Sequence, residues 1–401
     1  MKTRTSIVNK TGPVVIAAGG TGGHLFPGQS LAQELRRRGR SIVLMTDERV
    51  QHFDRLFPGA DIYAVPSATP TNRGLVGLVQ SAPAIVSGIA QAFGILGRIE
   101  PSVVIGFGGY PTLPPLAAAI LRGIPTCVHE QNAVLGRVNR LVAPFVQAIA
   151  STFAEPKFLK PRDAGKLVVT GNPVRDAVIE QAASPYAVPD DAGTIHLLVF
   201  GGSQGARVFS DVVPGALALL PAALKARLEV VQQARPEDLD RVRSAYDRAG
   251  IRAVLDSFFD DMPARIAKAH LVIGRSGAST VSELAVIGRP SILVPLPHSL
   301  DNDQKANARK FEEAGAAWMI EQKDFTEAAL GEKLAALFAA PSALATAAAA
   351  ALAQGQPRAV RRLADLVEML GRGAFRSGQI AFLDEDDIDS PGPLLLAQGG
   401  C

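Results

Sequence analysis

Residues 14–24 read VVIAAGGTGGH and residues 197–207 read LLVFGGSQGAR, so one local arrangement occurs twice in this 401-residue chain. In both stretches an apolar run leads into the pattern GG[ST]xG, and a helical pattern follows. A glycine-rich turn between a buried strand and a helix is typical of nucleotide-binding βαβ units. The repetition predicts two related domains.

Short apolar runs alternate with helical patterns along both halves of the chain. In the first half, these runs occupy residues 14–18, 41–45, 62–65, 103–105, 126–128 and 148–151. In the second half, they occupy residues 195–200, 229–231, 253–255, 271–273, 291–294 and 318–320. Such alternation predicts parallel sheets with helices on both faces. We expect an α/β protein with two doubly wound, Rossmann-like domains that face one cleft.

The expected first domain spans residues 1–172 and the expected second domain spans residues 173–370. Residues 325–369 are rich in Ala and Leu and are predicted to form helices that close the second domain, with the last helix either staying there or returning to the first. Residues 371–401 combine Gly, Pro and an acidic cluster without periodicity. That composition predicts a disordered tail.

Composition excludes several classes of protein. The chain has only two cysteines, Cys127 and Cys401, which argues against a disulfide framework and a cysteine-based metal site. The first 12 residues lack the apolar core of a secretory signal, so a cytosolic location is expected.

The net charge of +3 conceals an asymmetry, because five carboxylates lie between residues 384 and 389. Without them the net charge is +8. A basic body suits phosphate-bearing ligands or an anionic bilayer, although an ordinary solvated surface explains it nearly as well. Nothing indicates a nucleic-acid partner.

The two glycine loops place unpaired amides and a helix dipole where an anion can bind, and Thr21 and Ser203 each add a hydroxyl donor. Neither loop matches the dinucleotide fingerprint or the P-loop, which disfavours an oxidoreductase. The alternative is that the glycines only form tight turns. His24 follows the first loop, either as a general base for transfer to an alcohol or as a residue that organises the loop.

Further polar groups follow other strands. Two such clusters are His129–Asn132 and Gly171–Arg175, and each consists either of ligand contacts or of a structural turn. The guanidinium of Arg175 could pair with a diphosphate. In the second half, Glu283 either accepts ribose hydroxyls or caps a helix, and Gln304 suits sugar hydroxyls. The D-x-D spacing at residues 301–303 admits a divalent cation, but acidic residues are common at helix starts, so no metal is expected.

Residues 74–97 contain no charged side chain, and their length admits a membrane span. Gly77, Pro83, Gly88 and Gly94 and several polar residues interrupt the stretch. This composition favours a core helix preceded by an apolar surface loop, with the Leu75–Val79 end able to enter a bilayer face.

Taken together, these motifs resemble the MurG family of peptidoglycan N-acetylglucosamine (GlcNAc) transferases. The matching segments are GGTGGHLFPG (19–28), GFGGYPTLPP (106–115), HEQNAVLGRVNR (129–140), TGNPVR (170–175), GGSQGAR (201–207), FFDDM (258–262), RSGASTVSEL (275–284) and NDQKANA (302–308). They occur in order across most of the chain, which is more specific than any single glycine loop.

The resemblance implies a GT-B fold that transfers GlcNAc from UDP-GlcNAc to the lipid-linked precursor lipid I, with inversion and without a metal or other cofactor. It implies that the second domain holds the donor and that the first domain approaches the acceptor at the cytoplasmic face of the inner membrane. The implied donor contacts are Thr21, Gly22, Gly23, Asn132, Arg175, Ser203, Phe259, Ala278, Ser279, Thr280, Val281, Ser282, Glu283 and Gln304. The implied contacts of the acceptor diphosphate are Gly108, Gly109 and Tyr110. His24 occupies the position of the family's loop histidine, and other cell-wall or division proteins are candidate partners.

Two alternatives remain. A UDP-sugar transferase for another lipid or small acceptor would share this fold. A catalytically silent UDP-sugar-binding scaffold would have the same loops but would not catalyse transfer. The segment Val231–Arg235 lacks the glycine expected after its strand, which weakens any assignment of a contact there. The acidic tail also departs from the family's compact ending.

Overall fold

The structure is a computed structural model that describes residues 12–19, 22–47, 56–68, 75–190, 192–202 and 205–375, with only the backbone given for residues 75–80. Contacts divide the chain into two compact units. Unit 1 contains residues up to Gln131, Leu135–Pro173 and the chain from Arg358. Unit 2 contains Asn132–Val134 and Val174–Pro357. The expected tail lies outside the described residues from 376 onward.

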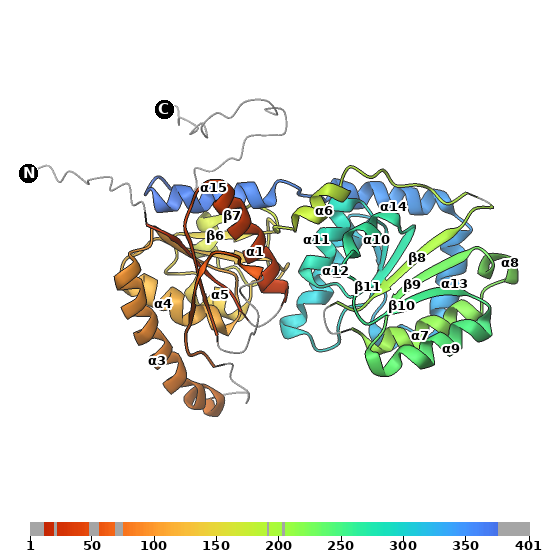
Figure 1. Cartoon of the computed structure of the whole chain (residues 1–401), viewed down its shortest axis with the longest axis horizontal. Coiled ribbons are helices and arrows are strands. Elements are labelled where there is room, and N and C mark those ends of the chain that lie inside the picture. Colours follow the sequence, from red (N-terminus) through yellow and green to blue (C-terminus); the bar gives the residue numbers. More distant parts are fainter. Residues whose placement is uncertain are drawn as a thin grey trace, which may run out of the picture. The chain divides into compact units, whose positions relative to one another are not determined.

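Unit 1 is built on a seven-stranded parallel sheet of order β3-β2-β1-β4-β5-β6-β7 (Figure 1). The strands are β1 Val14–Ala17, β2 Ile42–Thr46, β3 Asp61–Ala64, β4 Val103–Gly106, β5 Thr126–Glu130, β6 Ala148–Ser151 and β7 Leu167–Val169. The central strands are buried along their whole length, as expected where helices cover both faces. Val14 of β1 pairs with Ile42 on one side and Val103 on the other.

The helices of unit 1 form two layers. They are α1 Gly22–Arg37, α3 Leu75–Ile99, α4 Leu113–Leu121, α5 Arg137–Val142 and α15 Ala359–Gly371, with the short helices η1 Tyr110–Thr112 and η2 Pro161–Lys166. Helices α1 and α15 pack on one face of the sheet and α3, α4 and α5 on the other. The last helix of the chain therefore completes the first sheet rather than the second.

Unit 2 repeats the scheme with a six-stranded parallel sheet of order β10-β9-β8-β11-β12-β13. The strands are β8 Ile195–Phe200, β9 Leu228–Gln233, β10 Arg252–Asp256, β11 Leu271–Gly274, β12 Ser291–Leu293 and β13 Ala317–Met319. The helices are α6 Asp176–Gln181, α7 Arg207–Ala218, α8 Ala222–Lys225, α9 Leu239–Ala249, α10 Met262–Lys268, α11 Ala278–Ile287, α12 Asp303–Glu313, α13 Glu327–Phe338 and α14 Pro341–Ala353, with η3 Pro236–Asp238, η4 Leu300–Asn302 and η5 Gln322–Asp324. Helices α7, α9 and α13 cover one face, and α6, α10, α11, α12 and α14 pack on the other.

The predicted α/β class with two Rossmann-like sheets is confirmed. Every predicted apolar run contributes to a strand, and the prediction omitted only β7, a three-residue edge strand. The prediction for residues 74–97 is wrong in one respect, because the helix α3 already begins at Leu75 where a surface loop was expected. Pro83 is accommodated inside this helix, whose packing against α4 outweighs the local interruption.

Helix α3 also differs from a core helix in its exposure. Ala92, Ile95 and Leu96 are buried against the sheet, whereas Val86 is 64% and Phe93 39% exposed. Among the described residues, its stretch Ser81–Ile99 is the one single helix long and apolar enough to cross a membrane, and the bent pair α13 and α14 passes the same test only when taken together. Only 22% of Ser81–Ile99 is buried. One side of α3 thus packs in unit 1 and the other presents apolar side chains outward.

Candidate active site

His24 lies in the first turn of α1, directly after the first glycine loop. Its Nδ1 lies 3.0 Å from the carbonyl oxygen of Phe107, at the end of β4. A carbonyl only accepts hydrogen bonds, so Nδ1 carries the proton and donates it. The neutral imidazole therefore keeps its lone pair on Nε2, which is the form that can accept a proton from a hydroxyl.

The loop after Phe107 passes close to this imidazole. Gly108 and Gly109 have φ angles of +87° and +77°, which favour glycine. A Cβ on Gly108 would lie 3.4 Å from Cε1 of His24, in van der Waals contact with the ring. The structure thus brings His24 together with Gly108 and Gly109, and Tyr110 begins η1 immediately afterwards.

A buried network fixes the same carbonyl from the opposite side. Nε2 of Gln131 donates to the Phe107 carbonyl at 3.1 Å and to Nδ1 of His129 at 3.0 Å. Nε2 of His129 donates to the carbonyl of Gly171 at 2.9 Å. His129 is fully buried and Gln131 is 2% exposed. Nε2 of Gln131 also lies 3.1 Å from the carbonyl of His129, so its two protons are shared among three acceptors. These contacts hold both histidines neutral and oriented.

Burial lowers the pKa of both imidazoles. The pKa of His24 falls from 6.5 to about 4 because the charged ring would be desolvated. The pKa of His129 also falls to about 4, mainly by burial, with an opposing effect of the Gly171 carbonyl and a smaller lowering from His24. At neutral pH both rings are uncharged.

The side chains of residues 129–131 are buried and hydrogen-bonded to other groups of the protein, as expected of structural supports. Glu130 is 2% exposed, and its Oε2 accepts from the Gly136 amide at 2.7 Å and from Nδ2 of Asn139 at 2.8 Å. Asn132 differs, because it belongs to unit 2 with the two residues after it. The polar run at the end of β5 thus divides between the two units after Gln131.

Arg175 and Glu283 form the charged centre of unit 2. Nη2 of Arg175 donates to Oε1 of Glu283 at 3.0 Å, and the Glu283 side chain is only 10% exposed. Burial raises the pKa of Glu283, and the adjacent guanidinium of Arg175 opposes that rise. The pair connects the segment after β7 to the helix α11.

The N-terminus of α11 supplies amides and a hydroxyl beside this pair. Gly277 is the N-cap, and the first turn contains no acidic residue, which leaves its positive dipole end available to an anion. The buried Oγ of Ser279 has no hydrogen-bond partner in the structure. The side chain of Val281 packs in the core, so only its main chain remains available to a ligand.

Asn307 organises the loop in front of α11, although sequence reasoning did not single it out. It is fully buried; its Nδ2 donates to Oδ1 of Asn132 and to the carbonyl of Ser276, and its Oδ1 accepts from the Ala133 amide. Oγ of Ser276 donates to the Gln304 carbonyl at 2.8 Å. Asn132, Gln304 and the 276–283 segment are therefore joined within unit 2.

The D-x-D residues lie at the start of a helix. Oδ1 of Asp303 accepts from the Gln304 amide at the start of α12, and Oε1 of Gln304 accepts from the Leu296 amide at 3.0 Å. Within the part of the chain that the structure describes, no group of three or more His, Cys, Asp or Glu residues could hold a metal ion.

The second glycine loop has supports that the sequence did not reveal. Gln233 accepts from the Gly201 amide at 3.1 Å and donates to the carbonyl of Ser257. Gly205 has a φ of +66°, and a Cβ there would lie 3.2 Å from Cγ of Arg235. The Nε of Arg235 is buried and has no hydrogen-bond partner among the described residues. The segment without the expected glycine thus places an amide and a guanidinium beside the loop.

Three further predicted contacts are Thr21, Ser203 and Phe259. Thr21 and Ser203 lie outside the described residues. Phe259 is 8% exposed and lies beneath the guanidinium of Arg265, 4.2 Å from the ring centroid. Its observed ring contact is with Arg265 rather than with the pair formed by Arg175 and Glu283.

Two parallel α/β units, each with a glycine loop between its first strand and the following helix, form the architecture of the GT-B glycosyltransferases, and the family models assign the chain to that class. Residues 14–151 match the glycosyltransferase family 28 N-terminal domain, and residues 196–363 match the family 28 C-terminal domain. The chain belongs to the MurG family of these enzymes.

Individual relatives agree with this assignment. The chain is 53% identical over 360 residues to a UDP-N-acetylglucosamine–N-acetylmuramyl-(pentapeptide) pyrophosphoryl-undecaprenol N-acetylglucosamine transferase of Chelativorans sp., covering 90% of this chain and 96% of the relative. It is 53% identical over 355 residues to the enzyme of the same name from Methylobacterium sp., covering 88% and 95%. The crystal structure of Acinetobacter baumannii MurG superposes with a TM-score of 0.73 at 26% identity, covering 89% of this chain and 99% of that one.

Proposed function

We propose that this protein transfers GlcNAc from UDP-GlcNAc to the C4 hydroxyl of the muramyl sugar in lipid I, forming lipid II for peptidoglycan synthesis. The observation that carries the proposal is the 53% identity to transferases named for this reaction, over nearly their whole length. Inversion at the anomeric carbon without a metal agrees with membership of the family.

The donor belongs to unit 2. The N-terminus of α11, with the Ser279 hydroxyl, suits the diphosphate of UDP, and Arg175 adds a cation beside it. Glu283, held by Arg175 at 3.0 Å, is the proposed acceptor for the ribose hydroxyls. Arg235 is a further candidate, because its buried Nε lies beside the second glycine loop without a partner in the described structure.

The acceptor hydroxyl belongs to unit 1, with His24 as its base. The Phe107 carbonyl keeps Nε2 of His24 unprotonated, so that atom can take the C4 proton as the hydroxyl oxygen attacks the anomeric carbon. UDP departs with the bonding electrons. A diphosphate held at the amides of Gly108 and Gly109 would raise the low pKa of His24 toward the working pH, since a nearby negative charge favours the imidazolium.

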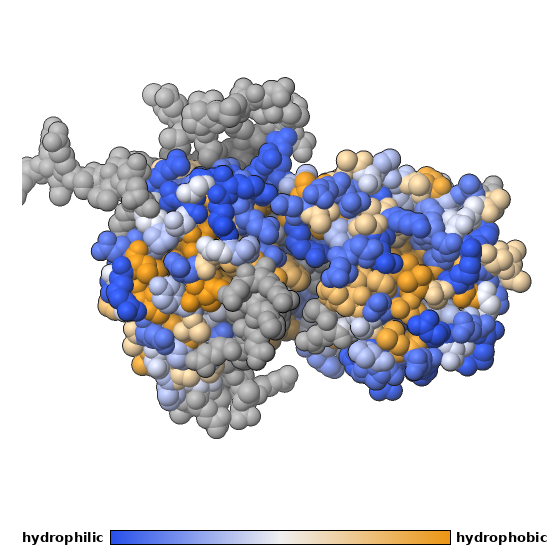
Figure 2. All heavy atoms as spheres, in the orientation of Figure 1, coloured by the Kyte–Doolittle hydropathy of each residue, from blue (hydrophilic) through white to orange (hydrophobic). Residues whose placement is uncertain are grey.

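An apolar surface on unit 1 fits a peripheral position on the cytoplasmic face of the inner membrane. Helices α3, α4 and α5 pack side by side, and Figure 2 shows hydrophobic surface over α3 and α4. The exposed apolar residues of this region, with exposures from 39% to 69%, are Val86, Phe93, Leu121, Leu141, Phe145 and Phe158. Arg122 and Arg140 stack on Phe93 and Phe158, so cations accompany the apolar side chains.

The decisive assay is transfer of labelled GlcNAc from UDP-GlcNAc to a lipid I analogue in the presence of EDTA, beside UDP-glucose and a small-alcohol acceptor. Product with UDP-GlcNAc and the lipid I analogue alone is expected. Product with another acceptor but not with lipid I would favour the alternative of a different UDP-sugar transferase. UDP-GlcNAc binding without any turnover would favour a binding scaffold.

Membrane contact has its own test in vesicle sedimentation. Val86→Glu and Phe145→Glu, each at a residue 64% exposed, are expected to reduce binding to vesicles that contain anionic lipid. The matched control is Leu219→Glu, at a residue 62% exposed on unit 2. Equal binding of all three variants would contradict the assignment of this surface.

A further inference from the structure

The strand β10 forms one edge of the sheet in unit 2 and pairs only with β9. The amide of Ala234 donates to the carbonyl of Asp256 at 3.0 Å, so the even-numbered residues of β10 direct their main-chain groups toward β9. Because this direction alternates along a strand, the N–H and C=O groups of Ala253 and Leu255 point away from the sheet. Within residues 205–375, these four groups have no hydrogen-bond partner. The edge is therefore available to another strand.

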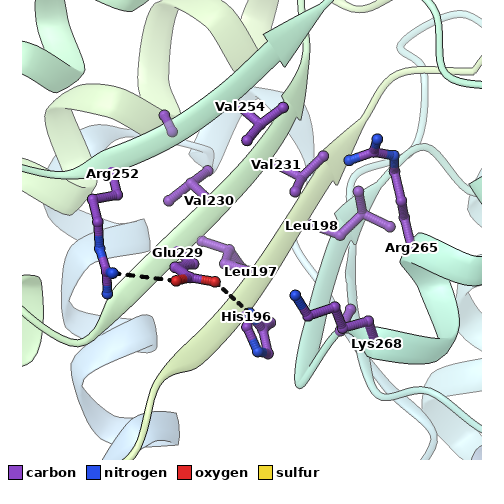
Figure 3. Close-up of a pocket in the computed structure, with 12 residues that line it drawn as sticks. His196, Leu197, Leu198, Glu229, Val230, Val231, Arg252, Val254, Arg265 and Lys268 are labelled. Atoms are coloured by element: carbon purple, nitrogen blue, oxygen red, sulfur yellow. Dashed lines mark ion pairs between the residues drawn. The ribbon is translucent and has the colours of Figure 1, made fainter.

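The side chains of β10 differ between its two faces. Ala253 and Leu255 pack against the core on the side of α7 and α9. Arg252, Val254 and Asp256 point to the other face, where all three are exposed. On that face Arg252 and Val254 line a groove in the surface of the sheet (Figure 3). Val254 is 55% exposed, so the edge presents an apolar side chain flanked by two charged ones.

The sequence of β10 is complementary to itself in the antiparallel direction. It reads Arg-Ala-Val-Leu-Asp, with charges of opposite sign at equal distances from Val254. If two copies pair about Val254, Arg252 of each copy lies opposite Asp256 of the other. Ala253 of each copy then lies opposite Leu255 of the other, and the outward N–H and C=O groups of these residues form four hydrogen bonds. The two Val254 residues meet at the twofold axis as a non-hydrogen-bonded pair, in which side chains are closest.

The charges select this register. A shift by two residues in either direction keeps the hydrogen-bonding groups aligned but places Arg252 or Asp256 opposite Val254. An in-register parallel pair would place Arg252 opposite Arg252. Edge strands often carry charges that prevent pairing, but here the charges attract each other in the one register centred on Val254.

We propose that this protein forms a symmetric dimer in which the β10 strands of two copies pair antiparallel about Val254. The interface is isologous, because the same five residues supply both sides of it. It joins the two six-stranded sheets of unit 2 into one continuous sheet. The strand is short, so we expect a dimer that dissociates on dilution.

The first test is a disulfide at the twofold axis. The Cα atoms of a non-hydrogen-bonded antiparallel pair lie about 4.5 Å apart, a distance that a disulfide can span. In a Cys401→Ser background, where only the buried Cys127 remains, Val254→Cys should give a disulfide-linked dimer on mild oxidation of the full-length protein. The matched control is Arg252→Cys, because the two copies of residue 252 would lie about 14 Å apart along the strands. It should cross-link at least about tenfold less. Equal cross-linking of the two variants, or none with Val254→Cys, would overturn the proposal.

Sedimentation equilibrium measures the dimer without a cross-link. Ala253→Pro removes an N–H that points away from the sheet and keeps the bonds to β9, so it should raise the dimer Kd at least about tenfold. Arg252→Asp, at a side chain 63% exposed, should have a similar effect because it places like charges opposite each other. Thermal unfolding checks that both variants fold.

The control for Arg252→Asp is Arg309→Asp on α12, which packs at the other edge of the same sheet beside β13. Arg309 is also exposed, and its substitution should leave the Kd unchanged. A protein that stays monomeric at all concentrations would overturn the proposal. A dimer that is insensitive to both Ala253→Pro and Arg252→Asp would also overturn it.

Discussion

The polar clusters of the two units use different physical means to hold their side chains in place. In unit 1, His24, Gln131 and His129 are neutral, and backbone carbonyls determine where each proton lies. In unit 2, Arg175 and Glu283 carry opposite charges and hold each other in a buried ion pair. Both clusters lie beside loops that open a helix, so the difference arises from the side chains and not from the topology.

This contrast matches the two tasks of the proposed reaction. A base must start neutral and oriented, which hydrogen bonds to carbonyls achieve without adding charge. A leaving diphosphate needs positive charge and free donors, which a guanidinium and a helix N-terminus supply. Substitutions in unit 1 should therefore change kcat and pH dependence, whereas substitutions in unit 2 should change donor binding.

The largest effect is expected from His24→Ala. Loss of the base should lower kcat about 10²- to 10⁴-fold, the usual contribution of a positioned general base, with little change in UDP-GlcNAc affinity. Initial-rate kinetics and calorimetric UDP-GlcNAc binding measure the two quantities. A variant that loses donor affinity and retains kcat would instead assign His24 to the organisation of the glycine loop.

The pH dependence of stability should identify His129. Its pKa is about 4 in the folded protein and 6.5 in the unfolded chain, so unfolding takes up a proton between these values. The stabilisation is complete above pH 6.5 and is lost as the pH falls to about 4, amounting to up to about 3 kcal/mol. Urea unfolding at pH 7 and pH 4.5 should show a smaller loss for His129→Gln than for the wild-type protein. Equal losses would show that His129 is not held neutral.

Arg175→Met should act on the donor side. It removes a cation and leaves Glu283 buried without that partner, so UDP-GlcNAc affinity should fall about 10- to 100-fold, a loss of about 2 kcal/mol. Calorimetry measures the affinity, and Arg265→Met provides a control, because Arg265 pairs with Asp261 rather than Glu283. A fall in kcat at unchanged affinity would contradict the division of tasks between the units.

Sequence reasoning found what contiguous patterns encode. The strands were predictable because buried parallel strands are continuous apolar runs, and His24 with the Gly108–Gly109 loop was predictable because each follows such a run. The role of Gln131 was not, since it depends on a carbonyl at residue 107 that β-sheet pairing brings close. The packing of α15 in unit 1 was undetermined for the same reason, because its helical periodicity does not specify which sheet it covers.

Gln131→Leu should produce a smaller, diagnostic change. The Phe107 carbonyl loses one of its two side-chain donors, and the orientation of His24 is relaxed, so we expect kcat to fall about tenfold and stability to fall by about 1–2 kcal/mol. The ¹⁵N shifts of the His24 ring should move from a single Nδ1–H tautomer to a mixture. An unchanged tautomer with reduced kcat would contradict positioning through the Phe107 carbonyl.

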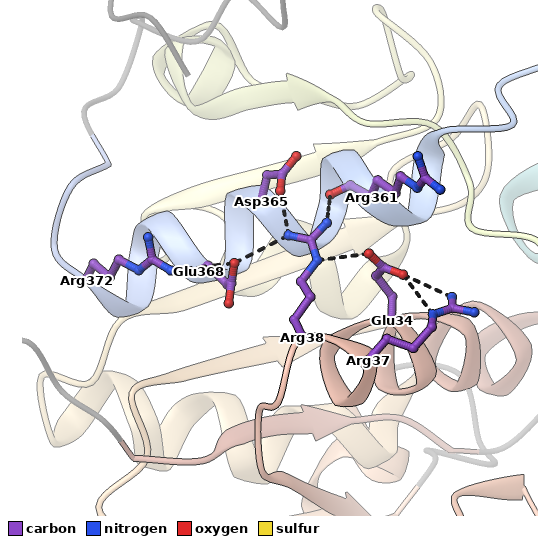
Figure 4. A network of polar contacts seen from close by, with 7 residues as sticks. All are labelled: Glu34, Arg37, Arg38, Arg361, Asp365, Glu368 and Arg372. Atoms are coloured by element: carbon purple, nitrogen blue, oxygen red, sulfur yellow. Dashed lines mark hydrogen bonds and ion pairs between the residues drawn. The ribbon is translucent and has the colours of Figure 1, made fainter. Parts of the chain in front are cut away.

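The smallest effect is expected where α15 packs on α1 (Figure 4). Ion pairs join these two helices, as an ion pair joins Arg175 and Glu283 in unit 2, but here the charged side chains are partly exposed. Arg38 contacts Glu34 at 2.9 Å, Asp365 at 2.6 Å and Glu368 at 3.4 Å, with 23% of its side chain exposed. Exposed pairs contribute little, but one guanidinium shared by three carboxylates forms a network. Arg38→Ala should therefore lower the free energy of unfolding by about 1 kcal/mol, measured by urea denaturation.

The matched control for Arg38→Ala is Arg372→Ala, at the end of α15. Arg372 meets Glu368 at 3.8 Å with 59% of its side chain exposed, so its removal should cost less than about 0.5 kcal/mol. If the two variants are equally stable, the packing of Leu363, Leu366 and Val367 alone holds α15 against the sheet. In that case the ion pairs of Arg38 do not help to hold α15, because solvent screens these exposed charges. The buried pair of Arg175 and Glu283 is screened much less, so its charges still organise the site of unit 2.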